Sequence, residues 1–314
     1  MRTELANELN SVKTLSIVGM CKNAGKTTVL NWLLRRSGGR VLGLTSIGRD
    51  GESTDVVTGT EKPGIFVREG TLFATAKDML ALCDVTQEIL FTTGIPTPVG
   101  EVVIVRAKSA GWVQLAGPSI TSQLKTVSDL FFSLGVEQTV IDGALGRKSL
   151  GARAVADGVI LCTGASYHMR MEKTVADTAN LYRIMNLKKA ETMPEETDAP
   201  LADVIKTRGE ALIGGALTDS MLLPLLMNGV LKNARLVVKD PSKVLLSTET
   251  LEKLDARAVS LETVDAARTL CVTVNPVSAY GWRYDRDAFL KAMAAAVNVP
   301  VIDVKEEFHD TDRV

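Results

Sequence analysis

The chain has 314 residues, of which 46% are hydrophobic and 23% are charged, and its formal net charge at pH 7 is −1. This nearly neutral charge does not indicate binding to nucleic acid or to a membrane surface. No apolar run reaches the roughly 20 residues that a membrane-spanning helix requires. The polar start of the sequence does not resemble a signal peptide. The four cysteines have no C-x-x-C spacing: Cys21, Cys83, Cys162 and Cys271. We therefore expect a cytoplasmic protein without disulfides or a zinc site, binding neither nucleic acid nor membranes.

Strand-like apolar runs alternate with segments of helical period, which predicts an α/β fold with a mostly parallel sheet. The first unit is a strand over 14–19, a turn with glycine, and a helix through 27–36, followed by a strand within 40–48. The alternation resumes at about residue 121 with further helices and strands, including a short helix expected near 149–156.

The region from about 60 to 120 interrupts this alternation. Its run EVVIVRA (101–107), a Lys-Ser-Ala-Gly turn and the run WVQLAG (112–117) predict a β-hairpin inside an insertion. A polar, proline-containing stretch at 188–200 reads as a linker. We therefore expect a nucleotide-binding domain over 1–187 and a C-terminal α/β domain over 201–314.

The first strand runs into the sequence Gly19-Met-Cys-Lys-Asn-Ala-Gly25-Lys26-Thr27-Thr28. It predicts a phosphate-binding loop, in which backbone N–H groups and a helix N-terminus surround phosphate oxygens. Lys26 would reach the β- and γ-phosphates, and the Thr27 hydroxyl would bind magnesium. The standard pattern has glycine where this chain has Met20, but the strand before the loop and the helix after it support the prediction. The residues expected to contact the nucleotide are Gly19, Lys22, Asn23, Ala24, Gly25, Lys26, Thr27 and Thr28.

Hydrolysis also needs acidic side chains near the metal, supplied by the ends of neighbouring strands. Asp142 ends a buried strand and is followed by glycine, as expected of a metal-facing acid. The loop after the second strand contains Asp50, Glu52 and Asp55, any of which could meet magnesium or position a water. We expect Lys26, Asp142 and Asp50 to be catalytic, and the metal ligands to come from Thr27, Asp142, Asp50 and Asp55.

The sequence VNPVSAYGWRYD (274–285) follows a strand and adds two further nucleotide-contact candidates, Asn275 and Pro276. No N-K-x-D guanine motif follows any strand, which favours ATP and leaves GTP open.

The motifs CKNAGKTTVLN, TSIGRDGE, TGIPTPVGEVVIVRA, VQLAGPS, IDGALGR and VNP resemble the dethiobiotin synthetase-like branch of P-loop proteins. Within that branch they are most similar to the ATPase subunits of lysine 5,6-aminomutase reactivases. The resemblance covers most of the chain. It implies ATP-driven repair of a cobalamin-dependent aminomutase together with a second, MutS-like subunit, with Lys26, Thr27 and Asp142 carrying the nucleotide chemistry.

Three classes of function stay open at this point. The first is an ATPase that reactivates or remodels a partner enzyme. The second is an ATP-dependent ligase or kinase that acts on a small molecule. The third is a regulatory nucleotide-binding module with negligible turnover. A protein partner and a homodimer are both compatible with the sequence.

Overall fold

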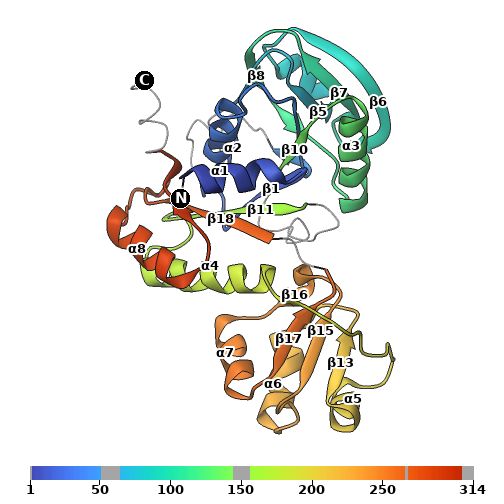
Figure 1. The fold of residues 1–314 in the computed structure, drawn as a ribbon, viewed down its shortest axis with the longest axis vertical. Helices are drawn as coiled ribbons and strands as arrows, with labels where there is room; N and C mark the ends of the chain where they lie inside the picture. Colours follow the sequence, from blue (N-terminus) through green and yellow to red (C-terminus); the bar gives the residue numbers. More distant parts are fainter. Residues whose placement is uncertain (1, 51–63, 144–155, 266–267, 306–314) are drawn as a thin grey trace.

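The computed structural model describes residues 2–50, 64–143, 156–265 and 268–305. It consists of a large sheet with its helices and a smaller sheet below it in Figure 1. The large sheet has nine strands in the order β19-β18-β11-β1-β10-β2-β5-β7-β6. In chain order these are β1 (Thr14–Gly19), β2 (Leu42–Ser46), β5 (Leu72–Ala76), β6 (Gln87–Thr97), β7 (Gly100–Ala107), β10 (Gln138–Asp142), β11 (Gly158–Gly164), β18 (Arg268–Asn275) and β19 (Val301–Ile302).

The strands from β19 to β5 are parallel to their neighbours, and β7 and β6 are antiparallel additions at one edge. Every residue of the central strand β1 is buried, as expected of a parallel strand with both faces covered. Successive side chains of β1 enter different cores: Ile17 packs with α1 and α2, while Val18 packs with α4 and α8. The helices around this sheet are α1 (Arg2–Ser11), α2 (Lys26–Arg35), α3 (Thr121–Ser133), α4 (Met171–Met185) and α8 (Arg286–Ala296), with a 3₁₀ helix η1 (Lys77–Leu82).

The predicted α/β class with a mostly parallel sheet is confirmed, but the hairpin partner was wrong. Strand β7 pairs with β6, which precedes it, through a turn at residues 98–99. The run after β7 instead forms β8 (Gly111–Val113), which pairs with β4 (Ile65–Val67), and β9 (Leu115–Ala116), which pairs with β3 (Arg49–Asp50). An apolar run predicts a strand but not its partner, and the residues after Ala107 pair with β4 and β3 instead of with β7.

The smaller sheet is built from residues 188–263. Its strands are parallel in the order β12-β17-β15-β13, with its own apolar core. The elements of this part are β12 (Lys188–Lys189), α5 (Leu201–Arg208), β13 (Glu210–Ile213), β14 (Leu217–Thr218), α6 (Asp219–Met227), β15 (Arg235–Val238), η3 (Pro241–Lys243), β16 (Val244–Leu245), α7 (Thr248–Ala256) and β17 (Ser260–Thr263).

Two features of the sheets differ from the expected boundaries. Strands β18 and β19 extend the large sheet beside β11 instead of joining the smaller one, so the strands after residue 201 are divided between two sheets. The stretch expected as a linker, 188–200, begins with β12, which pairs with β17. Both residues of this short edge strand are exposed lysines, so the sequence has no apolar pattern there that would predict a strand.

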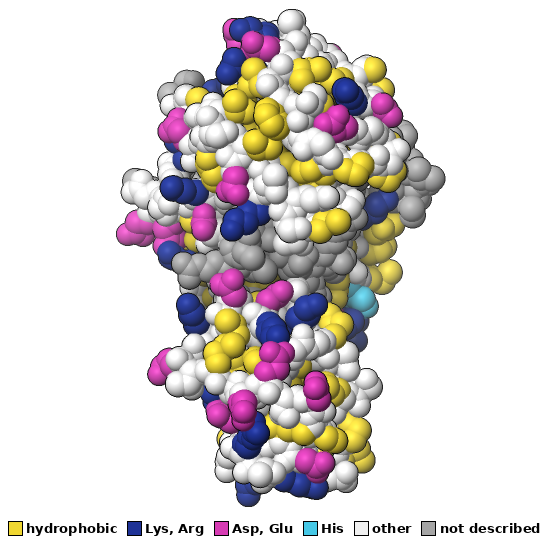
Figure 2. Space-filling model, turned by 90° about the vertical axis from the view of Figure 1, so that its right-hand side faces the viewer, with side chains coloured by type: hydrophobic (Ala, Val, Ile, Leu, Met, Phe, Trp, Pro, Cys, Tyr) yellow, Lys and Arg dark blue, Asp and Glu magenta, His cyan; other side chains and the backbone are white. Residues whose placement is uncertain are grey.

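The surface of the described residues has mixed charge. On the face drawn in Figure 2, basic and acidic side chains are interspersed over both parts of the molecule. Within the described residues, no helix has the length and apolar character that spanning a membrane requires.

Candidate phosphate-binding site

The loop between β1 and α2 follows the carboxyl end of β1. This strand lies inside the sheet, between β10 and β11. Gly25 caps α2 with φ +96°, and Asn23 also has a positive φ of +60°. The left-handed backbone at Gly25 is favourable only for glycine. Since α2 begins at Lys26, the N–H groups of residues 26–28 have no partner within the helix and lie at its positive end.

The Lys26 side chain folds back over the end of β1. A Cβ atom on Gly19 would lie 3.0 Å from both Cγ and Cδ of Lys26. Gly19 is therefore needed because the lysine passes directly over it. This is a direct contact between the first and the last part of the predicted motif.

Met20 explains why the motif can depart from the standard pattern. Its N–H donates to the Cys162 carbonyl oxygen at 2.8 Å, so position 20 continues the pairing of β1 with β11. Its side chain is buried in the same core as Leu181 of α4 and Phe289 of α8. Position 20 is still part of the strand pairing and its side chain fills the core, so glycine is not required there. The backbone that requires glycine comes later, at Gly25.

Asp142 lies at the end of β10, immediately beside the loop. It pairs in register with Ile17, two residues before Gly19, and only 2% of it is exposed. The backbone on both sides of the strand end is fixed, since Ile47 N–H donates to the Asp142 carbonyl and Gly143 N–H donates to the Ile17 carbonyl, both at 3.0 Å. The end of β10 therefore has a defined position next to β1.

The charges of Lys26 and Asp142 act on the same thiol. Burial raises the pKa of Cys162 to about 12, a hydrogen bond with Thr273 lowers it, Lys26 lowers it and Asp142 raises it. Both charged groups are therefore near enough to Cys162 to influence its pKa. Burial also raises the pKa of Cys21, within the loop, to about 11, and Lys26 partly offsets this. Cys21 is a protonated thiol at neutral pH, which does not suit a nucleophile.

Asn275, at the end of β18, contacts the loop at Asn23 and Gly25. Its Nδ2 donates to the Asn23 carbonyl oxygen at 3.3 Å, and its Cβ lies 3.8 Å from the position a Cβ would take on Gly25. The next residue, Pro276, accepts from the Tyr284 N–H at 2.9 Å and so belongs to the following turn. Of the two candidates in this segment, only Asn275 touches the loop among the contacts of the described residues.

The remaining candidates of this loop differ in exposure. Ala24 is buried, Thr27 and Thr28 are half-buried in the first turn of α2, and Lys22 is exposed. For the acids of the second loop the outcome differs. The backbone of Asp50 belongs to strand β3, opposite Leu115, but its side chain is not among those described. Glu52 and Asp55 lie outside the described residues. Within the described part of the chain, no group of three His, Cys, Asp or Glu side chains could hold a metal ion by itself. A magnesium ion bound through nucleotide phosphates needs only one or two protein ligands.

A polar cleft that the sequence did not predict lies next to the loop. Its volume is about 530 Å³. Met20, Tyr167 and residues of α4 lie on one side of it, and the N-terminus of α7 lies on the other. Asp177 is its central group, accepting from Tyr167 Oη at 2.8 Å, Lys173 Nζ at 3.0 Å and Thr248 Oγ1 at 3.5 Å. Burial and the bond to Asp177 raise the pKa of Tyr167 to about 12. No sequence signal could show this cleft, because its residues come from three distant segments.

Comparisons with known proteins give no further identification. No protein-family model, no curated protein and no solved structure matches the chain.

Proposed function

We propose that the chain binds a nucleoside triphosphate at the β1–α2 loop and hydrolyses it with magnesium, with ATP as the favoured nucleotide and GTP still open. The observation that carries the proposal is the position of Lys26. Its side chain lies over Gly19, at a helix N-terminus capped by a left-handed glycine. A lysine beside exposed helix N–H groups is the arrangement that binds phosphate oxygens, and Asp142 ends the neighbouring strand β10.

The residues fit a magnesium nucleotide. The hydroxyl of Thr27 and the carboxylate of Asp142 are oxygen ligands of the kind that magnesium takes. When bound, the metal would neutralise phosphate charge. Lys26 would hold the β- and γ-phosphate oxygens, and the N–H groups of residues 26–28 would donate to the phosphates. Asp50 and Asp55 remain candidates for positioning the attacking water.

The test is the loss of Lys26. We expect Lys26→Ala to weaken binding of a non-hydrolysable ATP analogue by about 2–4 kcal/mol, roughly 30- to 700-fold, because a charge-assisted contact is lost. Titration calorimetry measures this, and Lys125→Ala, which removes an exposed charge from α3, is the matched control. Unchanged affinity for ATP and GTP analogues in a folded Lys26→Ala variant would remove the phosphate site.

For the use of hydrolysis, we propose the remodelling of a partner enzyme, such as reactivation of a cobalamin-dependent aminomutase. This rests on the motif resemblance. A purified chain of this kind is a slow ATPase whose turnover rises with its partner, because a nucleotide shifts a binding equilibrium only by its different affinity for two states.

One observation favours a second candidate, an ATP-dependent enzyme acting on a small molecule. The cleft beside Met20 is concave, polar and adjacent to the phosphate loop, as a second-substrate site would be. Steady-state ATP turnover separates the two candidates. Fast turnover with a small carboxylate or amine, and no protein partner, would promote the ligase or kinase; turnover stimulated only by a protein would promote the reactivase.

A further inference from the structure

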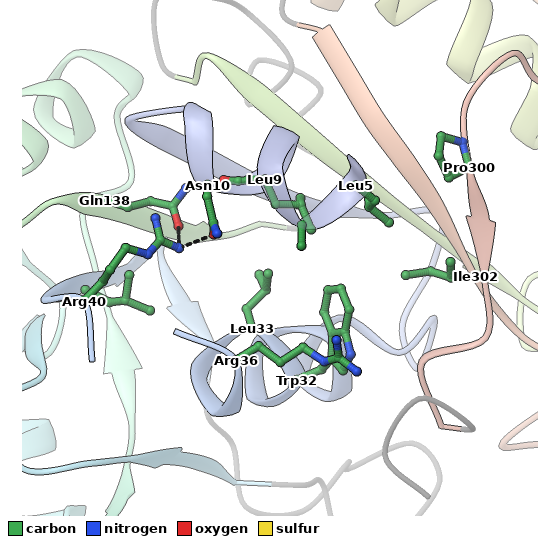
Figure 3. Close-up of a pocket in the computed structure, with 12 residues that line it drawn as sticks. Leu5, Leu9, Asn10, Trp32, Leu33, Arg36, Arg40, Gln138, Pro300 and Ile302 are labelled. Atoms are coloured by element: carbon green, nitrogen blue, oxygen red, sulfur yellow. Dashed lines mark hydrogen bonds between the residues drawn. The ribbon is translucent and has the colours of Figure 1, made fainter. Parts of the chain in front are cut away.

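A pocket of about 240 Å³ lies between α1 and α2, shown in Figure 3. It includes Leu42 and Gln138, which begin strands β2 and β10. The pocket is therefore at the amino ends of the parallel strands, whereas the phosphate loop follows the carboxyl end of β1. It is a separate site from the proposed nucleotide site.

The walls of this pocket are apolar and come from three elements. Leu5 and Leu9 project from α1, Trp32 and Leu33 from α2, and Ile302 from β19 (Figure 3). Elements from both ends of the chain thus converge on one hollow. Its volume is below the roughly 300–1,000 Å³ of pockets for drug-sized ligands, so it suits a compact molecule and is too small for a nucleotide.

A cationic group is held at the rim by neutral partners. Arg40 donates to Asn10 Oδ1 at 2.5 Å and to Gln138 Oε1 at 3.3 Å, and Figure 3 shows these three side chains together at one side of the pocket. Gln138 is itself fixed, because its Nε2 donates to the carbonyl oxygens of Leu9 at 2.6 Å and Val12 at 2.8 Å. Within the described residues Arg40 has no carboxylate partner. Its positive charge is positioned but not neutralised there.

Trp32 of α2 and Arg36, the residue directly after α2, also line the pocket. The Arg36 guanidinium carbon lies 5.3 Å from the centre of the Trp32 ring. The Trp32 Nε1 donor is buried and has no hydrogen-bond partner within the described part of the chain. A buried donor without an acceptor is uncommon and costly in a native protein. Protein atoms enclose Nε1, so the apolar part of the indole ring is what Trp32 offers to the pocket.

We propose that this pocket binds a small amphiphilic carboxylate, a molecule with one negative charge and a short apolar chain. The chain lies among Leu5, Leu33 and Trp32, and the carboxylate pairs with the guanidinium of Arg40. A carboxylate fits better than a phosphate monoester, because the planar fork of the positioned Arg40 matches the planar carboxylate, while Arg36 lies over the Trp32 ring. The apolar walls contribute through burial of the chain.

Calorimetry of the full-length protein with octanoate tests the proposal, and no nucleotide is needed. We expect octanoate to bind at least tenfold more tightly than octan-1-ol or octyl phosphate. Arg40→Gln should weaken octanoate binding at least tenfold, whereas Arg35→Gln, the same charge change on α2 outside this pocket, should change it less than twofold. Because nucleotide is absent, failure here leaves the phosphate site untouched.

A second variant guards against misfolding of Arg40→Gln, since that arginine also makes structural hydrogen bonds. Ala6→Phe fills the pocket from the exposed side of α1 without removing any of these bonds. It should abolish octanoate binding while the circular dichroism spectrum stays that of the parent. In a Trp112→Phe/Trp282→Phe background Trp32 is the only tryptophan, and octanoate should shift its emission. Equal binding of octanoate and octan-1-ol, binding unaffected by Ala6→Phe, or no binding would each overturn the proposal.

Discussion

The two ends of α2 offer a ligand opposite kinds of surface. At its N-terminus the contacts come mostly from the main chain: a left-handed glycine, helix N–H groups and one lysine folded over Gly19. At its C-terminus they come from side chains, with Trp32 and Leu33 beside the positioned Arg40. A site built from backbone recognises an anion through dipoles and needs small residues at fixed spacing. A site built from side chains recognises shape, and its residues need no common spacing.

The largest effect that separates the two ends is expected for Asp142, beside the N-terminal end of α2. If the proposed function is right, Asp142→Asn should lower ATP turnover at least tenfold while nucleotide binding is retained, because it removes a charge at the proposed magnesium site and keeps the side-chain shape. Steady-state hydrolysis and calorimetry measure the two quantities.

Asp157 is the matched control at the other end of β1, where its Oδ2 accepts from the Thr14 N–H at 3.0 Å. Asp157→Asn should leave turnover within twofold. If both variants lose turnover equally, the loss reflects stability and Asp142 has no special role.

A smaller effect is expected from the glycines that flank α2. Gly25 has φ +96° and Gly39 has φ +87°, so alanine at either position should cost about 1–2 kcal/mol of unfolding free energy. Only Gly25→Ala should also weaken nucleotide binding, by about fivefold, because only Gly25 shapes the phosphate loop. Urea denaturation and calorimetry check this. Equal nucleotide affinity in both variants would mean that the Gly25 conformation serves the fold alone.

The smallest effect concerns the thiol of Cys21 in the loop. Burial raises its pKa to about 11, so at pH 8 only about one molecule in a thousand is a thiolate and alkylation is slow. The rate should increase with pH up to about 11. Since Lys26 lowers this pKa, Lys26→Ala should slow the alkylation severalfold at pH 8 to 9, as followed by mass spectrometry of the Cys21 peptide. Fast alkylation at pH 7 would contradict the buried, protonated thiol.

The sequence predicted the N-terminal end of α2 far better than the rest. Gly19, Gly25 and Lys26 lie close together along the chain, and local backbone geometry alone brings them into contact. Asp142 was found because apolar strands that end in an acid at the same sheet edge become neighbours in a parallel sheet.

Side-chain sites gave no such signal. The pocket at the other end of α2 joins residues of α1, α2 and β19, and the cleft around Asp177 joins α4 to Thr248. These meetings depend on the packing of helices onto the sheet, which periodicity does not encode. The same reason explains the wrong hairpin: the continuous apolar run of β7 predicts a buried strand but does not identify its partner, and β7 pairs with β6.

The smaller sheet also constrains the order in which the protein can be completed. Residues 188–263 lie between α4 and β18 in the chain. The first and last strands of this segment, β12 and β17, pair with each other. All strands of the smaller sheet lie within that span, so it can form before the large sheet is closed. Strand β11 then has an open edge until β18 is synthesised. Because Asn275 at the end of β18 contacts Asn23, the loop that leaves the ribosome among the first residues gains this support only near the end of synthesis.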